Sequence, residues 1–350
     1  MELLIAIVYV ILGFVALVWG ADRFVFGAAS SARNLGVSPL LVGLTIVAFG
    51  TTAPEILVSA TAALTGNPGL CIGNAVGSNI TNIALVLGAA ALVRPLRVHS
   101  RILSRDLPVL IVIMAFAALL VSDGLLSFWD GSLLFGGMFV LIGSVVRAGL
   151  RQPPLQDSND ALQQGSNESP ARSDEESMAS VPLPTGTRVA VFWFSAGLIM
   201  LLVGSRLLVD GAVTVAQTIG VSDVVIGLSV VALGTSLPEL AASVVAAYRN
   251  EHDIALGNVI GSNMFNTLGV LGLPGMIVPT EVAPICLYRD FSFMVGVAVL
   301  VLLLSYTSKR PYRLSRLSGA ILLTCYAGYL CALVFDSWEP PPNPPGLEYL

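Results

Sequence analysis

Long apolar blocks constrain this chain of 350 residues more than any other feature. Each block runs for about 15–25 residues, which as a helix spans the roughly 30 Å hydrocarbon core of a bilayer, and none has the short alternation of a membrane β-barrel. Only 11% of the residues are charged, whereas soluble domains carry roughly 25%. The sequence therefore predicts an all-α polytopic membrane protein that contacts the lipid bilayer.

The blocks predict about ten membrane-spanning helices in two sets of five. They are expected over residues 3–26, 39–64, 70–93, 108–122 and 132–149, then over 188–210, 224–248, 254–277, 291–306 and 317–335. We therefore divide the chain into a first five-helix segment over 1–150, an acidic cytoplasmic linker over 151–187, a second five-helix segment over 188–336 and a Pro-rich tail over 337–350.

Several classes of protein are excluded by what the sequence lacks. A net charge of −5 with no basic domain argues against a nucleic-acid partner. The four cysteines stand singly, which argues against a disulfide scaffold. No His-Glu-x-x-His motif, Ser/Lys pair or catalytic Asp pair is present, so we expect no enzyme and no cofactor. No protein partner is evident.

Basic residues predict the orientation, because short cytoplasmic loops hold an excess of Lys and Arg. With the N-terminus and the C-terminus both outside, all of the 17 basic residues except Arg206 and Arg289 fall on the cytoplasmic side. We also expect Asp22, Asp106, Asp210 and Asp290 to be solvated at the membrane interfaces. No cleavable signal precedes the first block, so the first helix is expected to remain.

An internal repeat relates the two halves. A shift of 184 residues places Gly20 through Asp106 on Gly204 through Asp290 without a gap. Because each half has an odd number of helices, the second must enter the membrane in the opposite orientation to the first. Two inverted-topology five-helix repeats of this kind are the architecture of secondary transporters, whose substrate site lies near the midplane where the repeats meet.

The first repeated motif places one carboxylate deep in apolar sequence in each half. Glu55 and Glu239 each follow Gly-Thr-(Thr/Ser)-x-Pro. Pro54 and Pro238 cannot donate a backbone hydrogen bond, so the helix is expected to break or kink and to free carbonyls near the preceding glycine. A charged side chain at this depth is functional by default, and a purely structural buried carboxylate is the alternative.

The second repeated motif is a polar stripe along one side of an apolar helix. Asn74, Ser78 and Asn82 are spaced by four residues, and Asn258, Ser262 and Asn266 repeat the pattern. Such groups also serve as hydrogen-bonding contacts between membrane helices, an alternative that applies most to Asn74, Asn79, Asn258 and Asn263.

Collected at the midplane, these groups form a set of hard oxygen ligands suited to Na⁺ or Ca²⁺. No His or Cys joins them, which disfavours zinc, copper and iron. No Lys or Arg within a span neutralises the two Glu, so bound cations must do so, and an empty site would resist reorientation. We therefore expect obligatory cation exchange.

These paired motifs resemble the repeats of the calcium/cation antiporter superfamily, specifically the prokaryotic sodium/calcium exchangers. The resemblance covers both five-helix halves and implies a multi-pass protein of the bacterial inner membrane, in which Na⁺ entry drives Ca²⁺ out as the first and sixth helices slide or rock across a fixed core. It implies the following ion ligands, the last four being weaker candidates: Thr51, Glu55, Ser78, Asn82, Thr235, Glu239, Ser262, Asn266, Ala48, Thr52, Ala232 and Ser236.

One departure from the family bears on the coupling ion. Many relatives carry Asp at one of the positions held here by Asn82 and Asn266. Two Asn lower the charge of the site, which favours Na⁺ over K⁺ co-transport or proton coupling. The alternative function is H⁺/Ca²⁺ antiport, with Glu55 and Glu239 taking protons. A channel would not need a doubly charged site.

Overall fold

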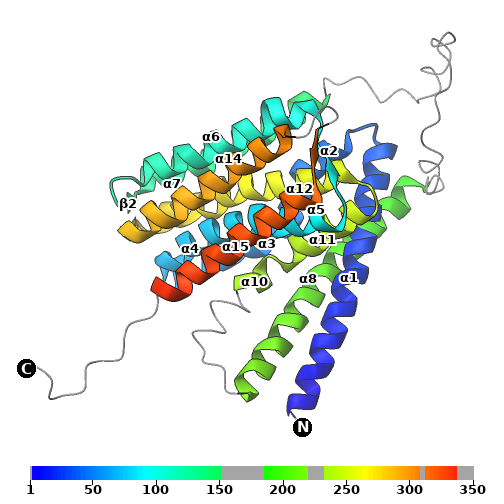
Figure 1. Cartoon of the computed structure of the whole chain (residues 1–350), viewed down its shortest axis with the longest axis horizontal. Coiled ribbons are helices and arrows are strands. Elements are labelled where there is room, and N and C mark those ends of the chain that lie inside the picture. The colour runs from blue at the N-terminus through cyan, green and yellow to red at the C-terminus, as the bar shows by residue number, and fades with distance from the viewer. Residues whose placement is uncertain (1, 151–184, 220–231, 308–311, 337–350) are drawn as a thin grey trace, which may run out of the picture.

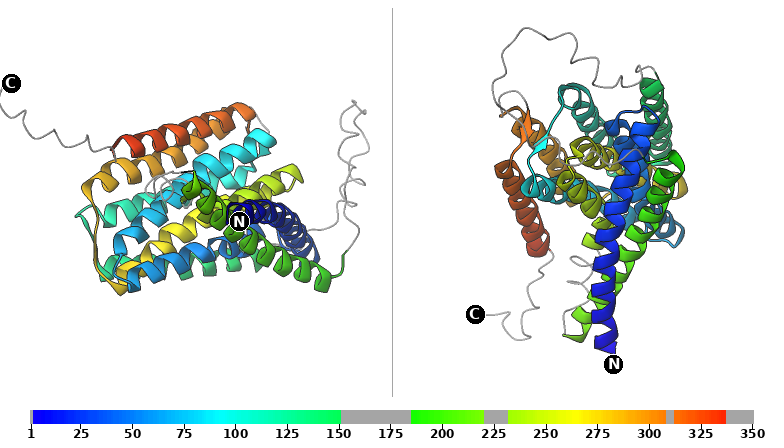
Figure 2. Two further views of the ribbon diagram at one scale, coloured as in Figure 1. Left: turned by 90° about the horizontal axis from the view of Figure 1, so that it is seen from below. Right: turned by 90° about the vertical axis from the view of Figure 1, so that its right-hand side faces the viewer.

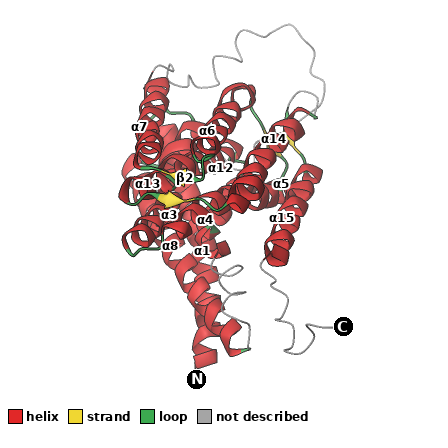
Figure 3. Ribbon diagram, turned by 90° about the vertical axis from the view of Figure 1, so that its left-hand side faces the viewer, coloured by secondary structure: helices red, strands yellow, loops and turns green. Residues whose placement is uncertain are grey.

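The computed structural model describes residues 2–150, 185–219, 232–307 and 312–336, and these are almost entirely helical (Figure 3). Several helices contain a π-helical turn, labelled η. The first half comprises α1 (Glu2–Asn34), α2 (Pro39–Val42), η1 (Gly43–Val47), α3 (Ala48–Leu64), α4 (Pro68–Ile80), η2 (Thr81–Val86), α5 (Leu87–Val93), η3 (Ile102–Asp106), α6 (Leu107–Leu120) and α7 (Phe128–Leu150).

The second half repeats this order. It comprises α8 (Thr187–Thr218), α10 (Ala232–Thr235), α11 (Leu237–Tyr248), α12 (His252–Phe265), η6 (Asn266–Val270), α13 (Gly272–Ile277), η7 (Cys286–Phe291), α14 (Ser292–Tyr306) and α15 (Arg316–Asp336). The π-helical turns η2 and η6 correspond under the 184-residue shift, as do η3 and η7.

The predicted polytopic helical fold is confirmed. Among the described residues, nine helical stretches are long and apolar enough to cross a membrane, and Leu237–Tyr248 is a shorter apolar helix. That shorter helix belongs to the span expected over 224–248, of which residues 224–231 lie outside the described part of the chain. The first helix runs to Asn34, beyond the predicted end at residue 26.

The helices α1 and α8 form an antiparallel pair at one side of the molecule (Figures 1 and 2). A glycine lies at every seventh position of the contact on both helices. A Cβ atom on any of them would come within 3.0 Å of the other helix's backbone: Gly13, Gly20, Gly27, Gly197, Gly204 and Gly211. Small residues therefore let the two backbones touch, as close packing in a membrane requires.

Two short antiparallel strand pairs join the halves at opposite ends of the bundle (Figure 1). Strand β1 (Leu96–Arg97) pairs with β4 (Arg313–Leu314), and β2 (Leu125–Leu126) pairs with β3 (Thr280–Glu281). Each pair takes one strand from each half, so the two pairings are equivalent under the repeat.

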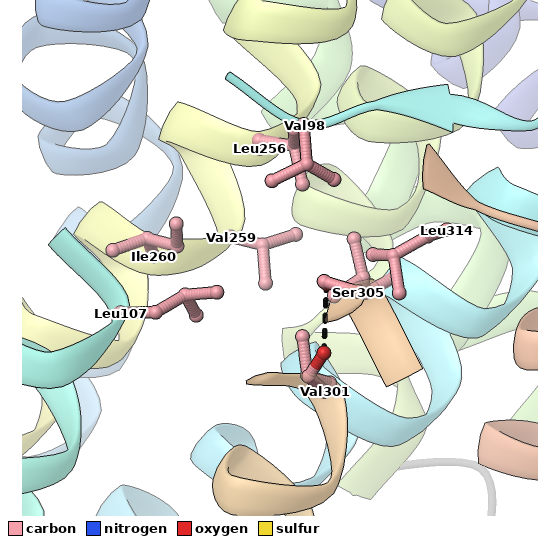
Figure 4. A pocket seen from close by; sticks show the side chains of 9 residues that line it. Val98, Leu107, Leu256, Val259, Ile260, Val301, Ser305 and Leu314 are labelled. Atoms are coloured by element: carbon pink, nitrogen blue, oxygen red, sulfur yellow. Dashed lines mark hydrogen bonds between the residues drawn. The ribbon is translucent and has the colours of Figure 1, made fainter. Parts of the chain in front are cut away.

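The helix α12 lies at the centre of the bundle. In the segment His252–Ile277, every residue of the most apolar window is buried, against 22% for the windows of α1 and α8. The packing around it is tight: a cavity of about 10 Å³ remains beside Val259 and Ile260, room for about one water. Figure 4 shows its apolar lining, with the Ser305 hydroxyl already donating to the Val301 carbonyl at 2.7 Å.

Charged contacts gather at the end of the bundle that holds the Arg-rich loops. Each joins a residue of the first half to one of the second: Asp22 with Arg249, Arg33 with Glu251 (3.1 Å), His99 with Asp253 (2.7 Å), and Arg94 with the Tyr248 carbonyl (3.1 Å). These contacts hold the two halves together at the end that carries the Arg-rich loops.

Candidate functional site

The two carboxylates of the first motif lie on α3 and α11, and both are completely buried. The two helices that carry Glu55 and Glu239 contact each other. One carboxylate comes from each half of the chain. An unneutralised pair of this kind is costly at membrane depth, so the site favours bound positive charge.

The backbone beside these carboxylates differs between the halves. In the second half the helix breaks at Ser236, between α10 and α11, as the proline predicted. In the first half α3 runs without interruption through Pro54, and the irregular backbone lies earlier, in the π-helical turn η1. The expected break is therefore present in the second half only.

A side chain of a neighbouring helix donates a hydrogen bond to the backbone carbonyl that Pro238 leaves without an amide partner. The Ser205 hydroxyl on α8 donates to the Gly234 carbonyl at 3.0 Å. The corresponding residue of α1 is Ala21, which has no hydroxyl to offer. This contact was not expected from the sequence, because it depends on how α8 packs against the broken helix.

Two asparagines of the second motif hold the carboxylate-bearing helices in place. The Asn74 amide donates to the Ser59 hydroxyl at 3.0 Å and to the Glu55 carbonyl at 3.2 Å. The Asn258 amide makes the equivalent contact with the Ser243 hydroxyl at 2.9 Å. These asparagines make hydrogen bonds between membrane helices, which is the alternative to ion binding that the sequence left open for them.

The sequence reasoning missed the two serines that receive these bonds. Ser59 and Ser243 are fully buried, and each lies four residues after the glutamate of its half. Their repetition under the 184-residue shift was a signal that could have identified them.

The side chain of Thr51 links the halves across the site. Its hydroxyl lies 3.2 Å from the Asn258 amide oxygen, 3.5 Å from the Ser262 hydroxyl and 3.2 Å from the Ala48 carbonyl. Thr51 and Ser262 are both completely buried. The first motif of one half therefore packs directly on the second motif of the other.

Several buried polar groups have no hydrogen-bond partner among the described residues, and they lie on or beside the two carboxylate-bearing helices or on the turns η2 and η6 that contact those helices. They are both carboxylate oxygens of Glu55 and Glu239, both side-chain polar atoms of Asn82 and Asn266, and the hydroxyls of Thr52 and Ser236. Buried polar groups are rarely left unpaired in proteins, so a concentration of such groups indicates a site for a ligand. Bound cations would satisfy the oxygens.

The asparagines in this set lie in π-helical turns. Asn82 is the second residue of η2, and Asn266 is the first residue of η6. Such turns occur mostly as single irregularities within α-helices and are frequent at functional sites.

The other predicted ligands are placed as follows. Ser78 is buried, at 5% exposure, and Ala48 is completely buried. Thr235 is partly buried at the end of α10, and Ala232 begins that helix.

The expectation that four aspartates are solvated is wrong for two of them. Asp106 and Asp290 are 7% and 9% exposed, respectively. Both lie in π-helical turns that the surrounding helices cover, and hydropathy alone does not detect such burial.

Comparison with known proteins identifies the family. The family described as sodium/calcium exchanger protein matches residues 5–146 and 189–335, which excludes the acidic linker. This chain belongs to the sodium/calcium exchanger protein family. The resemblance seen in the motifs is thereby confirmed, and the protein is a multi-pass integral membrane protein of the cation antiporter class.

Three relatives are similar to this chain along nearly their whole length. The chain is 44% identical over 327 residues to the putative antiporter CaxA of Alkalimonas amylolytica, covering 93% of this chain and 98% of that one. It is 38% identical over 341 residues to the inner membrane protein YrbG of Escherichia coli, covering 97% and 99%. It is 32% identical over 361 positions to the sodium/calcium exchanger MaX1 of Methanosarcina acetivorans, covering 93% and 97%.

The fold is also similar to solved structures of the sodium-calcium exchanger NCX_Mj. One of them matches with a TM-score of 0.78 and 32% identity, covering 95% of this chain and 99% of that one.

Proposed function

We propose that this protein exchanges Na⁺ for Ca²⁺ across the membrane by alternating access, with the ions bound between Glu55 and Glu239. The observation that carries this proposal is the set of unpartnered oxygens around two completely buried carboxylates, one from each half. Carboxylate, hydroxyl and amide oxygens are the ligands that Ca²⁺ and Na⁺ prefer.

We assign ion binding to the oxygens that surround these two carboxylates. The ligands are Thr51, Glu55, Ser78, Asn82, Thr235, Glu239, Ser262 and Asn266, with Ala48, Thr52, Ala232 and Ser236 as auxiliary donors of carbonyl or hydroxyl oxygens. Asn74 and Asn258 are positioning residues, because their amides bond the neighbouring helix.

The charge of the site explains why exchange is obligatory. Two carboxylates balance one Ca²⁺ or two Na⁺, and further Na⁺ can bind at the neutral oxygens. An empty site leaves two negative charges in a medium where each costs roughly 2.5–3.5 kcal/mol or more. The protein therefore changes conformation when it is loaded and resists doing so when it is empty.

Sodium is the coupling ion that the residues favour. The side-chain oxygens of Asn82 and Asn266 do not titrate, yet they are unpartnered among the described residues, on turns that contact the carboxylate-bearing helices. A proton would need only the carboxylates, whereas a sodium ion uses neutral oxygens as well. For this reason H⁺/Ca²⁺ antiport ranks second.

The two halves are inserted in opposite orientations, with both chain ends outside the cytoplasm. The antiparallel contact of α1 with α8 supports this arrangement, because these helices correspond under the repeat. The gathering of Arg33, Arg94 and Arg249 at one end supports its assignment to the cytoplasm. In a bacterium the protein would lie in the inner membrane, as the name of YrbG states for that relative.

A flux assay in proteoliposomes tests the proposed function. Vesicles loaded with NaCl are diluted into Na⁺-free medium containing ⁴⁵Ca²⁺, with a protonophore present to collapse any proton gradient. We expect rapid Ca²⁺ uptake that disappears when external and internal Na⁺ are equal. In matched vesicles without the protonophore, Ca²⁺ uptake that follows only an imposed pH gradient, and not the Na⁺ gradient, would establish H⁺/Ca²⁺ antiport instead.

A further inference from the structure

The Asn79 side chain makes a hydrogen bond between the two halves, at a point flanked by proposed ion ligands. Its amide donates to the Thr267 hydroxyl at 2.9 Å and to the Met294 sulfur at 3.4 Å. Asn79 follows Ser78 on α4, and Thr267 follows Asn266 on η6. Asn79 and Thr267 are each 1% exposed. The bond therefore joins two buried segments that carry proposed ligands, one from each half.

The hydroxyl of Thr267 is oriented by a second hydrogen bond. It donates its one proton to the Asn263 carbonyl at 2.9 Å, so toward Asn79 the oxygen can only accept. The same carbonyl also accepts the backbone N–H of Asn266. Asn79, Thr267 and the backbone of Asn266 thus belong to one connected set of hydrogen bonds.

The repeat does not supply this bond a second time. Under the shift of 184 the counterpart of Thr267 is Ile83, which has no hydroxyl, and the counterpart of Asn79 is Asn263. The Asn263 amide donates instead to the Val259 carbonyl of its own helix, at 2.6 Å. The turn η6 is therefore tied to α4 of the other half by a side-chain bond that η2 does not receive from α12.

The turn η2 is held by a helix nearer the outside of the bundle. The Thr81 hydroxyl, beside Asn82, donates to the Tyr326 hydroxyl on α15 at 3.4 Å. The most apolar window of α15 is 28% buried, against 72% for the segment that contains α4. Of these two contacts, only the bond from Asn79 joins the ligand-bearing segment of one half to that of the other.

We propose that Asn79 and Thr267 are positioning residues that fix the spacing between residues 78–82 and Asn266, and with it the size of the cation that the site prefers. This inference rests on the proposed function, because it takes those segments to carry the ion ligands. Cation selectivity depends on the size and flexibility of the ligand cage. A buried bond between the two segments limits how far they can separate, so its loss should let a larger ion fit at less cost.

The test compares Ca²⁺ with Ba²⁺, a larger ion of the same charge, by binding at equilibrium. In Na⁺-free detergent solution, ⁴⁵Ca²⁺ bound to the protein is displaced by unlabelled Ca²⁺ or by Ba²⁺, and the ratio of the two Kd values measures the preference for Ca²⁺. Thr267→Val keeps the shape of the side chain and removes the hydroxyl. We expect its Ca²⁺ affinity to fall roughly 10–100-fold and its Ba²⁺ affinity to fall less, so that the preference drops. Thr267→Ser keeps the hydroxyl and should retain the preference.

Two further variants separate positioning from a general loss of stability. Asn79→Leu/Thr267→Val replaces both partners by apolar groups, so no buried amide is left unpaired at this contact, and it should lower the preference as Thr267→Val does. Thr81→Val is the matched control, because it removes a buried hydroxyl beside Asn82 and its contact with Tyr326. It should leave the preference unchanged.

The outcomes distinguish this inference from the proposed function. If the unmodified protein binds ⁴⁵Ca²⁺ and Thr267→Val shows the same preference for Ca²⁺ over Ba²⁺, the inference is overturned and the proposed function is untouched. The inference is also overturned if Thr81→Val lowers the preference as much as Thr267→Val. An unmodified protein that binds no ⁴⁵Ca²⁺ would contradict the proposed function itself, and the inference with it.

Discussion

The glycines between α1 and α8 allow a prediction whose size follows from distances. In Gly20→Ala the new Cβ atom would lie 2.5 Å from the Leu201 nitrogen and 2.9 Å from the Met200 carbonyl carbon. Real Cβ contacts are essentially never shorter than 3.0 Å. Both neighbours are backbone atoms that cannot rotate away, so the two helices must separate locally by at least about 0.5 Å, the difference between 2.5 and 3.0 Å.

Overpacking of this kind costs roughly 1–3 kcal/mol, which corresponds to a fall of roughly 2–12 °C in melting temperature. The assay is thermal unfolding in detergent, followed by loss of the monodisperse peak on size exclusion. Gly204→Ala should behave alike, because its Cβ would meet the Leu17 nitrogen at 2.5 Å. The control is Gly296→Ala, where nothing lies within 4 Å and the helix should gain about 0.5–1 kcal/mol. If the Gly20→Ala protein has the same melting temperature as the Gly296→Ala protein, the close backbone contact between α1 and α8 is wrong.

Three further predictions concern the site. Glu55→Gln and Glu239→Gln should each abolish ⁴⁵Ca²⁺ exchange while the protein remains monodisperse, since one carboxylate cannot balance a divalent ion. If either variant still exchanges Ca²⁺, the ion site does not lie between these two glutamates. Ser205→Ala leaves the Gly234 carbonyl unpaired and should lower stability by about 1–3 kcal/mol in thermal unfolding, whereas Ser132→Ala, at an exposed hydroxyl, should change it little. Asn258→Ala should raise the KM for Ca²⁺ by roughly 10–100-fold, as loss of a residue that positions ligands does elsewhere; an unchanged KM would contradict the positioning role.

Most of the fold follows from hydropathy and repetition. The second span was predicted over 39–64, and α2, η1 and α3 together cover those residues, because Pro39 favours a helix start and Gly66, at φ +83, favours a turn after the end. The end of the first helix was missed by eight residues. Residues 27–34 are small or polar and lower the hydropathy, but Gly27 packs on the backbone of α8, and this contact extends the helix.

The site was only partly predictable for a similar reason. Repetition pointed to Glu55 and Glu239, since an ionisable side chain within a membrane span is costly and this one occurs at the same place in both halves. It did not reveal that α3 continues through Pro54, or that Asp106 is buried, because both depend on which helices pack alongside. Internal symmetry shows where the halves should agree, and only their packing shows where they differ.

The central claim is that the two glutamates of opposite halves hold the transported ion between them. The most direct measurement is an anomalous difference map from crystals of the protein prepared in Ca²⁺ without Na⁺. We predict one strong peak within about 2.3–2.6 Å of carboxylate oxygens from both Glu55 and Glu239. A strong peak elsewhere, with no density between these carboxylates in a preparation that exchanges Ca²⁺, would contradict it.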